Sequence, residues 1–261
     1  DMVTGAGLDE ALDGVECAYY LVHSMEPGAD DFAARDRRAA ETFAAAARRA
    51  GVERVVYLGG LVPGATAAQP TASAHLASRL EVEEILLGAA PTSIAFRASI
   101  VIGAGSRSFR FLVRLVERVP VMPLPPWRRF RTQPIDVRDV LAYLLTAADS
   151  PALQGPLSLD VAGPDVLTYG EIVDRIRDHL LVGRPAVRLP VNATALASRI
   201  AAAVSGEEYA LVGPLMEGLT GDLLPRDARV RELLPVRLHT FDAAVERALR
   251  EWETTEELRA R

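Results

Sequence analysis

The sequence predicts an α/β fold: a Rossmann-like, doubly wound parallel sheet with a smaller, helix-rich C-terminal lobe. Three observations predict it. Short apolar runs alternate along the chain with amphipathic stretches of helical length. Glycines close several of these runs, as they do at the turns between strands and helices. The 261 residues, 49% hydrophobic and 25% charged, suffice for one large domain with a small lobe.

The first half of the chain shows the alternation clearly. A short helical stretch over 8–13 precedes the apolar, aromatic-rich run 15–22, which predicts a buried strand. A helix follows over 30–50, with Phe32, Ala39, Phe43 and Ala47 on one face, and Gly51 ends it. The same reasoning predicts strands over 54–58, 93–96 and 157–161 and helices over 73–87, 109–119 and 136–148.

Beyond Gly163 the pattern becomes rich in helices. Helices are expected over 168–181, 193–204 and 241–252, with one short strand over 186–189. The run 120–126 contains too many prolines to be helical. We therefore expect a Rossmann-like domain over 1–163 and a C-terminal substrate lobe over 164–261, to which 104–134 also contributes.

Composition excludes several classes of function. A net charge of -6 argues against nucleic-acid binding. The single cysteine, Cys17, excludes an intramolecular disulfide, and the scattered histidines disfavour a metal site. A polar N-terminal stretch and the absence of any long apolar run predict a cytoplasmic protein without an integral membrane segment.

The chain contains no lysine, since all 29 basic residues are arginines. Schiff-base chemistry, a P-loop lysine and a lysine general acid are therefore excluded.

Thr4-Gly5-Ala6-Gly7 looks like a dinucleotide-binding fingerprint, but no apolar strand precedes it and no long helix follows it. Both are required of that motif, so we interpret it as a turn before a short helix.

Six segments together resemble the atypical short-chain dehydrogenase/reductase superfamily, and within it the NmrA-like, NAD(P)-binding bacterial branch, which includes epimerase-like proteins. They occur in order as YYLVHSM (19–25), RVVYLGGL (54–61), HLASRLEVEEIL (75–86), FRASIVIGAGS (96–106), QPIDVRDVLAYL (133–144) and DVAGPDVLTYGEIV (160–173). The pairing of LGGL with RASIVIG is the most specific part. The resemblance extends over about 8–250.

This resemblance implies NAD or NADP as cofactor. Proteins of the family begin with a strand and a TGATG-type loop that holds the pyrophosphate, and a second strand discriminates NADH from NADPH. Neither is present, so we expect about two βα units to be missing before Asp1. The preference for NAD or NADP is then not readable from this sequence.

By the same resemblance, three strand ends line the ribose and nicotinamide half of the cofactor site, because ligands of such sheets bind beyond the carboxyl ends of the strands. The expected cofactor-binding residues there are His23, Ser24, Gly59, Gly60, Leu61, Arg97, Ala98, Ser99 and Ile100. A plain tight turn is the alternative for Gly59-Gly60, and a strand-end cap is the alternative for His23.

The family uses Tyr-x-x-x-Lys on a helix and a Ser at the preceding strand end. Here the helix has His75 in the Tyr position and Arg79 in the Lys position, and the Ser position is Gly59 or Gly60. His75 is the candidate general acid/base and Arg79 a candidate cofactor ligand. Binding without catalysis and a solvated helix face remain open as alternatives.

Two further groups are candidates. Arg128, Arg129, Arg131 and Gln133 form a substrate-binding cluster for an anion, unless the loop is simply solvated. Asp136 and Asp139 are expected to cap a helix rather than to catalyse. Apolar residues beyond Ala193 allow core packing, a hydrophobic substrate or a homodimer contact; they include Leu211, Leu215, Met216 and Leu219.

The sequence therefore leaves three hypotheses. The chain is an NAD(P)-dependent oxidoreductase or epimerase-like enzyme acting on an unidentified small or lipid-like substrate. Alternatively, it is a non-catalytic, dinucleotide-binding redox sensor or scaffold. A third possibility is a truncated protein that binds nothing by itself.

Overall fold

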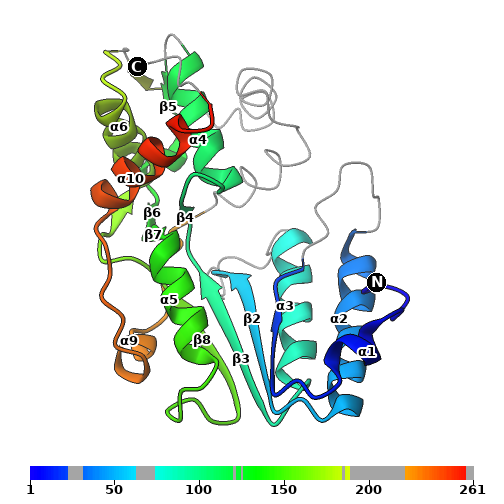
Figure 1. The fold of residues 1–261 in the computed structure, drawn as a ribbon. Coiled ribbons are helices and arrows are strands. Elements are labelled where there is room, and N and C mark those ends of the chain that lie inside the picture. The colour runs from blue at the N-terminus through cyan, green and yellow to red at the C-terminus, as the bar shows by residue number, and fades with distance from the viewer. Residues whose placement is uncertain are drawn as a thin grey trace. The chain divides into compact units, whose positions relative to one another are not determined.

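The computed structural model describes residues 1–22, 32–62, 74–119, 122–124, 126–183, 186–188 and 221–256, and it divides the chain into two compact units (Figure 1). Unit 1 consists of Asp1–Ala98, Leu141–Val161 and Pro225–Val236, and unit 2 of Ser99–Val140, Ala162–Leu224 and Arg237–Arg261. The sequence-based boundary placed residues 1–163 in one domain and 164–261 in the other, whereas each observed unit consists of three separate segments of the chain. The assignment of the second part as a substrate lobe stays a prediction.

Unit 1 contains a parallel sheet. Its described strands lie in the order β1 (Cys17–Tyr20), β2 (Arg54–Gly60), β3 (Thr92–Ala98) and β8 (Pro156–Val161). All three neighbouring pairs are parallel, with Cys17 opposite Arg54, Arg54 opposite Thr92 and Ser93 opposite Pro156. The helices of this unit are α1 (Leu8–Leu12), α2 (Phe32–Ala50), α3 (Ala74–Leu87), most of α5 (Val137–Ala147) and α9 (Arg229–Leu233). The predicted Rossmann-like architecture is confirmed.

Alternation along the strands distributes side chains between the two faces of this sheet. Tyr20, Tyr57 and Ala95 face one way and share a buried core with α2 and α3. Phe96 faces the other way and packs against Tyr143 of α5, with ring centroids 6.0 Å apart. The alanine-rich α2 lies close to its neighbours because Ala40, Ala46 and Ala47 are all fully buried.

Gly59 and Gly60 are strand residues, so the alternative of a tight turn is wrong. They continue β2 beyond the predicted end at residue 58 and pair with Arg97 and Ala98. The Thr4–Gly7 stretch does form a turn: Gly5 and Gly7 have φ angles of 81° and 78°, and the helix that follows is only five residues long.

Unit 2 contains short paired strands and longer helices. Its strand pairs are β4 (Val101–Ile102) with β7 (Ile135–Asp136), β5 (Met122–Leu124) with β10 (Ala186–Arg188), and β6 (Arg131–Thr132) with β9 (Leu167–Thr168). Its helices are α4 (Arg107–Arg118), the 3-10 turn η1 (Pro126–Arg129), α6 (Tyr169–His179) and α10 (Phe241–Glu253). The predicted elements are thus present with boundary shifts of a few residues, except 193–204, which lies outside the described residues.

The core of unit 2 is aromatic and lies among α4, α6 and α10. Phe109, Trp127, Tyr169, Phe241 and Trp252 are all buried in it. Local sequence explains where α6 begins, because Thr168 and Glu171 form a reciprocal capping box.

Gly163 marks a close backbone contact within unit 2. A Cβ atom built on it would lie 2.1 Å from the carbonyl oxygen of Pro134. Two rigid backbone segments cannot relax around such an overlap, so no other residue fits here.

We expect Gly163→Ala to lower the free energy of unfolding by on the order of 3 kcal/mol, the upper end of what overpacking costs. Urea denaturation followed by circular dichroism measures this. Gly105→Ala is the matched control, because a Cβ there meets no atom of the described residues within 4 Å. An equal, small effect of both variants would show that the contact at Gly163 is not tight.

Candidate functional site

The carboxyl ends of β2 and β3 are joined at one edge of the unit 1 sheet. Beyond Gly60, the N–H of Leu61 donates a hydrogen bond of 2.9 Å to the carbonyl of Ala98. Among the residues that the structure describes, a Cβ on Gly60 would meet only that carbonyl oxygen, at 4.0 Å, so these residues leave the backbone open to close approach. The structure therefore brings together Gly59, Gly60, Leu61 and Ala98, while His23 and Ser24 lie outside the described residues.

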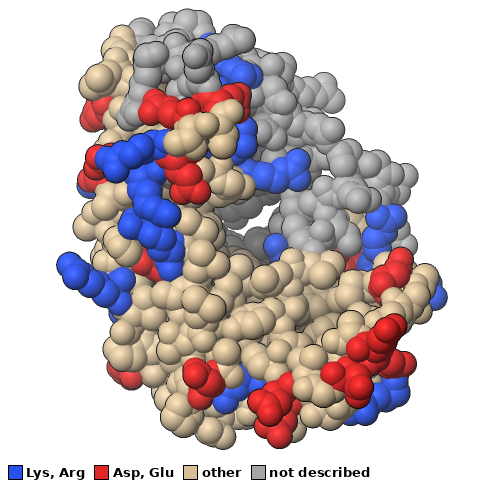
Figure 2. Space-filling view, in the orientation of Figure 1, with Lys and Arg blue, Asp and Glu red and all other residues tan. Residues whose placement is uncertain are grey.

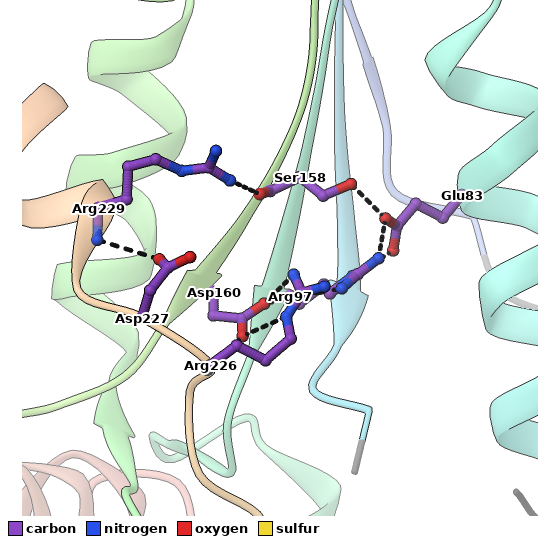
Figure 3. A network of polar contacts seen from close by, with 7 residues as sticks. All are labelled: Glu83, Arg97, Ser158, Asp160, Arg226, Asp227 and Arg229. Carbon is purple, nitrogen blue, oxygen red and sulfur yellow. Dashed lines mark hydrogen bonds and ion pairs between the residues drawn. The ribbon is translucent and has the colours of Figure 1, made fainter. Parts of the chain in front are cut away.

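A buried ion pair lies beside this edge. Arg97 of β3 donates from Nε and Nη2 to the two carboxylate oxygens of Glu83 on α3, at 2.7 and 2.5 Å (Figure 3). The hydroxyl of Ser158 on β8 donates to the same carboxylate at 2.5 Å. The side chains of Arg97 and Glu83 are only 11% and 5% exposed, so water screens this pair little.

The network continues through Asp160 of β8 (Figure 3). Nη1 of Arg97 is 4.0 Å from its carboxylate, and Arg226 donates to it from Nε, Nη2 and the backbone N–H at 2.8 to 2.9 Å. Arg229 of α9 donates to the carbonyl of Ser158. Two carboxylates thus alternate with two guanidinium groups, and Arg97 is committed to internal partners. Its predicted contact with a cofactor stays a prediction.

A second polar group of unit 1 surrounds Arg79 on α3. The guanidinium of Arg79 lies close enough to Tyr20 and Tyr57 to lower the pKa of each, although burial raises both pKa values overall. The buried carboxylate of Asp36 on α2 raises the same two pKa values. His75 lies four residues before Arg79 in the backbone of α3, which places both on one side of the helix. The side chain of His75 lies outside the described residues.

Tyr20 and Tyr57, which Arg79 and Asp36 both influence, were not among the residues predicted for the site. Tyr20 and Tyr57 lie in apolar runs that predict strands, and an aromatic residue in such a run is normally interpreted as part of the hydrophobic core. For Tyr20 the available signal was its position at the carboxyl end of β1, because ligands of such sheets bind beyond the carboxyl ends of the strands. Tyr57 lies in the middle of β2, where the sequence offers no comparable signal.

Unit 2 holds the remaining predicted residues, and most have partners within that unit. The Ser99 hydroxyl is 3.2 Å from that of Thr132, and the carbonyl of Ile100 accepts a hydrogen bond from Ile135. Gln133 is buried and donates to the carbonyl of Gly163 at 2.6 Å. These contacts support the local backbone, and the assignment of these residues to a ligand stays a prediction.

The arginine cluster of unit 2 is divided between two elements. Arg128 and Arg129 belong to η1, and Arg131 begins β6. Arg131 donates from Nε and Nη2 to the carboxylate of Asp222, at 2.8 and 2.6 Å. Its charge is therefore paired within the protein, and the anion clamp stays a prediction.

Asp136 and Asp139 have different roles. Asp136 accepts the N–H of Arg138 in the first turn of α5, which confirms the predicted capping interaction. Burial raises the pKa of Asp136, but hydrogen bonds from Arg138 outweigh it and lower that pKa overall. Asp139 is 1% exposed and accepts from the backbone N–H of His239 at 2.8 Å, with its other oxygen 2.6 Å from His239 Nδ1. It therefore fixes the segment before α10, which the sequence did not predict.

Within the described ranges, no group of three or more His, Cys, Asp or Glu residues is placed to hold a metal ion. None of the helices described there is long and apolar enough to cross a membrane.

Comparison with known proteins gives one extended match and many structural ones. No family model matches the chain. Ceramide reductase of Caulobacter vibrioides (strain NA1000 / CB15N) is 26% identical over 248 residues, which is 93% of this chain and 76% of that protein. The NAD-dependent NDP-hexosamine 5,6-dehydratase TunA has a TM-score of 0.67 at 15% identity, with 95% of this chain and 80% of that chain covered. RMD from Pseudomonas aeruginosa, solved with NADPH, has a TM-score of 0.68 at 14% identity, with 97% and 86% covered.

The solved structures confirm the Rossmann-like fold. The match to ceramide reductase agrees with the resemblance to atypical short-chain dehydrogenase/reductases.

We expect Glu83→Gln to lower the free energy of unfolding by about 3 kcal/mol. The buried guanidinium of Arg97 would then lose the negative charge of its closest partner. Glu81→Gln on the same helix is the matched control. Glu81 pairs with Arg37 at 2.7 Å, but both side chains are more than a third exposed, so the expected loss is below about 0.5 kcal/mol. Chemical denaturation of both variants measures the difference, and equal losses would contradict a special role for the buried pair.

Proposed function

We propose that this chain, an atypical short-chain dehydrogenase/reductase by fold and resemblance, is an NAD(P)-dependent oxidoreductase that works without the Tyr-Lys pair. The observation that carries the proposal is the similarity to ceramide reductase over 93% of the chain. The structural neighbours that use NAD or hold NADPH support a nicotinamide cofactor. An epimerase-like reaction uses the same cofactor chemistry and remains within this proposal.

The residues at the sheet edge fit the ribose and nicotinamide half of such a cofactor. The open backbone at Gly60 allows close approach of a planar ring, and the half-buried guanidinium of Arg79 offers fixed hydrogen-bond donors for ribose hydroxyls. When bound, the reduced cofactor supplies a hydride.

The proton must come from another residue than the usual tyrosine. His75 is the candidate, since an imidazole titrates near neutral pH and lies one helical turn from Arg79. Arg79 stays charged at any working pH, so it can bind and orient but cannot relay a proton.

An exposed apolar face of unit 1 supports the prediction that further βα units precede the first strand. Parallel sheets are normally covered by helices on both faces and rarely leave apolar side chains in water. Here exposed residues gather on β1, just beyond it, and on α5, which is joined to β1 by a hydrogen bond from the Tyr19 hydroxyl to the carbonyl of Leu144. Their exposures are 39% for Tyr19, 56% for Leu21, 40% for Val22, 51% for Leu141 and 70% for Leu145. Figure 2 shows few charged side chains on the visible face of unit 1 between α5 and α1.

For the substrate we propose a carbonyl on a lipid-like molecule. The similarity to ceramide reductase supports this class. A cytoplasmic location and a homodimer remain predictions of the sequence.

A non-catalytic, dinucleotide-binding scaffold is the second candidate. One observation favours it: by the resemblance, His75, Arg79 and either Gly59 or Gly60 stand in the positions of the three usual catalytic residues. It predicts nucleotide binding without turnover.

Fluorescence titration of NADPH and NADH tests cofactor binding directly. We expect micromolar binding by the natural full-length chain, with whatever its reading frame encodes before Asp1, and weaker binding by residues 1–261 alone. The physical reason is that the pyrophosphate loop supplies much of the affinity in this fold. If neither form binds either nucleotide, the oxidoreductase proposal fails.

His75→Ala tests the proton donor. If His75 is the general acid, this variant loses two to four orders of magnitude in kcat while the nucleotide Kd changes little. Steady-state oxidation of NAD(P)H with a panel of long-chain oxo compounds measures kcat. Unchanged kcat would remove His75 from the mechanism, and absence of turnover in the unaltered protein, with nucleotide bound, would favour the scaffold.

A further inference from the structure

The phenol of Tyr57 lies in the space above Gly59. Residues 57 and 59 of β2 face the same side of the sheet because strand side chains alternate. A Cβ on Gly59 would be 2.9 Å from Cε1 of Tyr57 and 3.2 Å from both Cζ and the hydroxyl oxygen. The ring therefore leans along the strand toward its carboxyl end and fills the place where a side chain at residue 59 would begin.

This packing gives a physical reason for glycine at residue 59, one of the two positions, 59 or 60, where the family resemblance places a serine. Contacts of 2.9 Å to Cβ are essentially never observed, and the neighbouring atoms here are a ring buried to 99%. A serine at residue 59 is thus incompatible with Tyr57 in this orientation, so the two features depend on one another.

The Tyr57 hydroxyl faces polar groups but is not satisfied by them. It is buried and, among the described residues, forms no hydrogen bond of standard geometry. The guanidinium of Arg79 lies within range to lower the pKa of Tyr57, although burial raises that pKa overall. The carboxylates of Glu83 and Asp36 also act on it, and both raise its pKa. The phenol therefore stays protonated at neutral pH, with lone pairs that can accept from Arg79.

A second buried hydroxyl on α3 has the same character. Ser78 is 4% exposed, and its oxygen has no partner among the described residues. Ser78, Val82 and Leu86 are spaced four residues apart, so they share the face of α3 that packs on the sheet. The helix α3 connects the parallel strands β2 and β3, so it runs opposite to them. The first part of α3 therefore lies toward the carboxyl end of β2. Buried hydroxyls are nearly always hydrogen-bonded in native proteins, so each of these two hydroxyls has hydrogen-bonding capacity that a small shift of a neighbouring donor would use.

We propose that Tyr57 is a positioning residue for the cofactor: its hydroxyl holds the Arg79 guanidinium at the carboxyl end of β2, where Arg79 meets the ribose hydroxyls in place of the missing lysine. The inference rests on the proposed function. Arg79 is a long side chain with several rotatable bonds, and ordering it before binding lowers the entropy cost of each ribose contact. Tyr57 acts through Arg79, and Gly59 leaves the room that this orientation needs.

A double-mutant cycle on nucleotide affinity tests the inference. The variants are Tyr57→Phe, Arg79→Met and the pair together, in the natural full-length protein. Tyr57→Phe keeps the ring and removes only the hydroxyl, so we expect the Kd for NAD(P)H to rise about five- to tenfold. In the Arg79→Met background the same change is expected to have no further effect, because the hydroxyl then has nothing to position.

Two more variants keep the test independent of folding. Gly59→Ala displaces the phenol and is expected to raise Kd as much as Tyr57→Phe does. When the two changes are combined, Kd is expected to rise no further than in either single variant. Tyr143→Phe is the matched control: Tyr143 is equally buried but packs against α5's side of the sheet, on Phe96, and its removal should leave Kd unchanged. In Tyr57→Phe, kcat at saturating cofactor should fall less than twofold, because the residue serves binding.

The outcomes are distinct. Non-additive effects of Tyr57→Phe and Arg79→Met support the inference. Additive effects, or an unchanged Kd in Tyr57→Phe with the unaltered protein still binding nucleotide, overturn it alone. Absence of nucleotide binding by the unaltered protein overturns it together with the proposed function.

Discussion

The ion pair between Arg97 and Glu83 is the interaction on which the arrangement of unit 1 depends. It joins α3 to β3, and through Ser158 and Asp160 it reaches β8 and the segment that carries Arg226. Removing either charge would leave the other uncompensated in a place with little water, so the folded state strongly favours the paired arrangement. Because α3 also carries His75 and Arg79, the orientation of the candidate site follows from this network. An arginine at a strand end thus supports the site from within, whether or not it also touches a ligand.

The absence of lysine has consequences that the structure makes concrete. A lysine beside a tyrosine can lower its pKa and also bind a ribose, and it is flexible enough to do both. Arg79 keeps the permanent charge and the hydrogen-bond donors, but its planar guanidinium needs a fixed orientation. Tyr20, Tyr57 and Asp36 provide polar surroundings for such a group. If Arg79 stands in the lysine position, as the resemblance implies, the surroundings of that side chain differ from the family pattern as well as the residue itself.

Much of the fold could be predicted from the sequence because it rests on local pattern. Apolar runs of strand length, helical periodicity and glycines at turns determine the order of elements and the parallel sheet. The two-unit division could not be predicted, since the chain passes between the units after residues 98, 140, 161, 224 and 236. Contacts such as that between Asp139 and His239, which are a hundred residues apart, cannot be predicted from local sequence pattern either. The predicted ends of β2 and β3, at residues 58 and 96, fall two residues short of the observed ends at Gly60 and Ala98. The partners of Arg97, Arg131 and Gln133 were not predicted.

Gly59 shows why a motif and its physical cause must be separated. In sequence, Gly-Gly at the end of an apolar run is typical of a turn or of a backbone that approaches a ligand. In the structure, Gly59 is an extended strand residue whose missing side chain makes space for the ring of Tyr57. The glycine thus reflects a neighbour two residues earlier on the same face of the strand. If the serine of the family pattern corresponds to Gly59, its replacement is coupled to the packing of Tyr57. In the arrangement proposed above, the hydroxyl of Tyr57 would then take the place of the serine hydroxyl as the polar group beside Arg79.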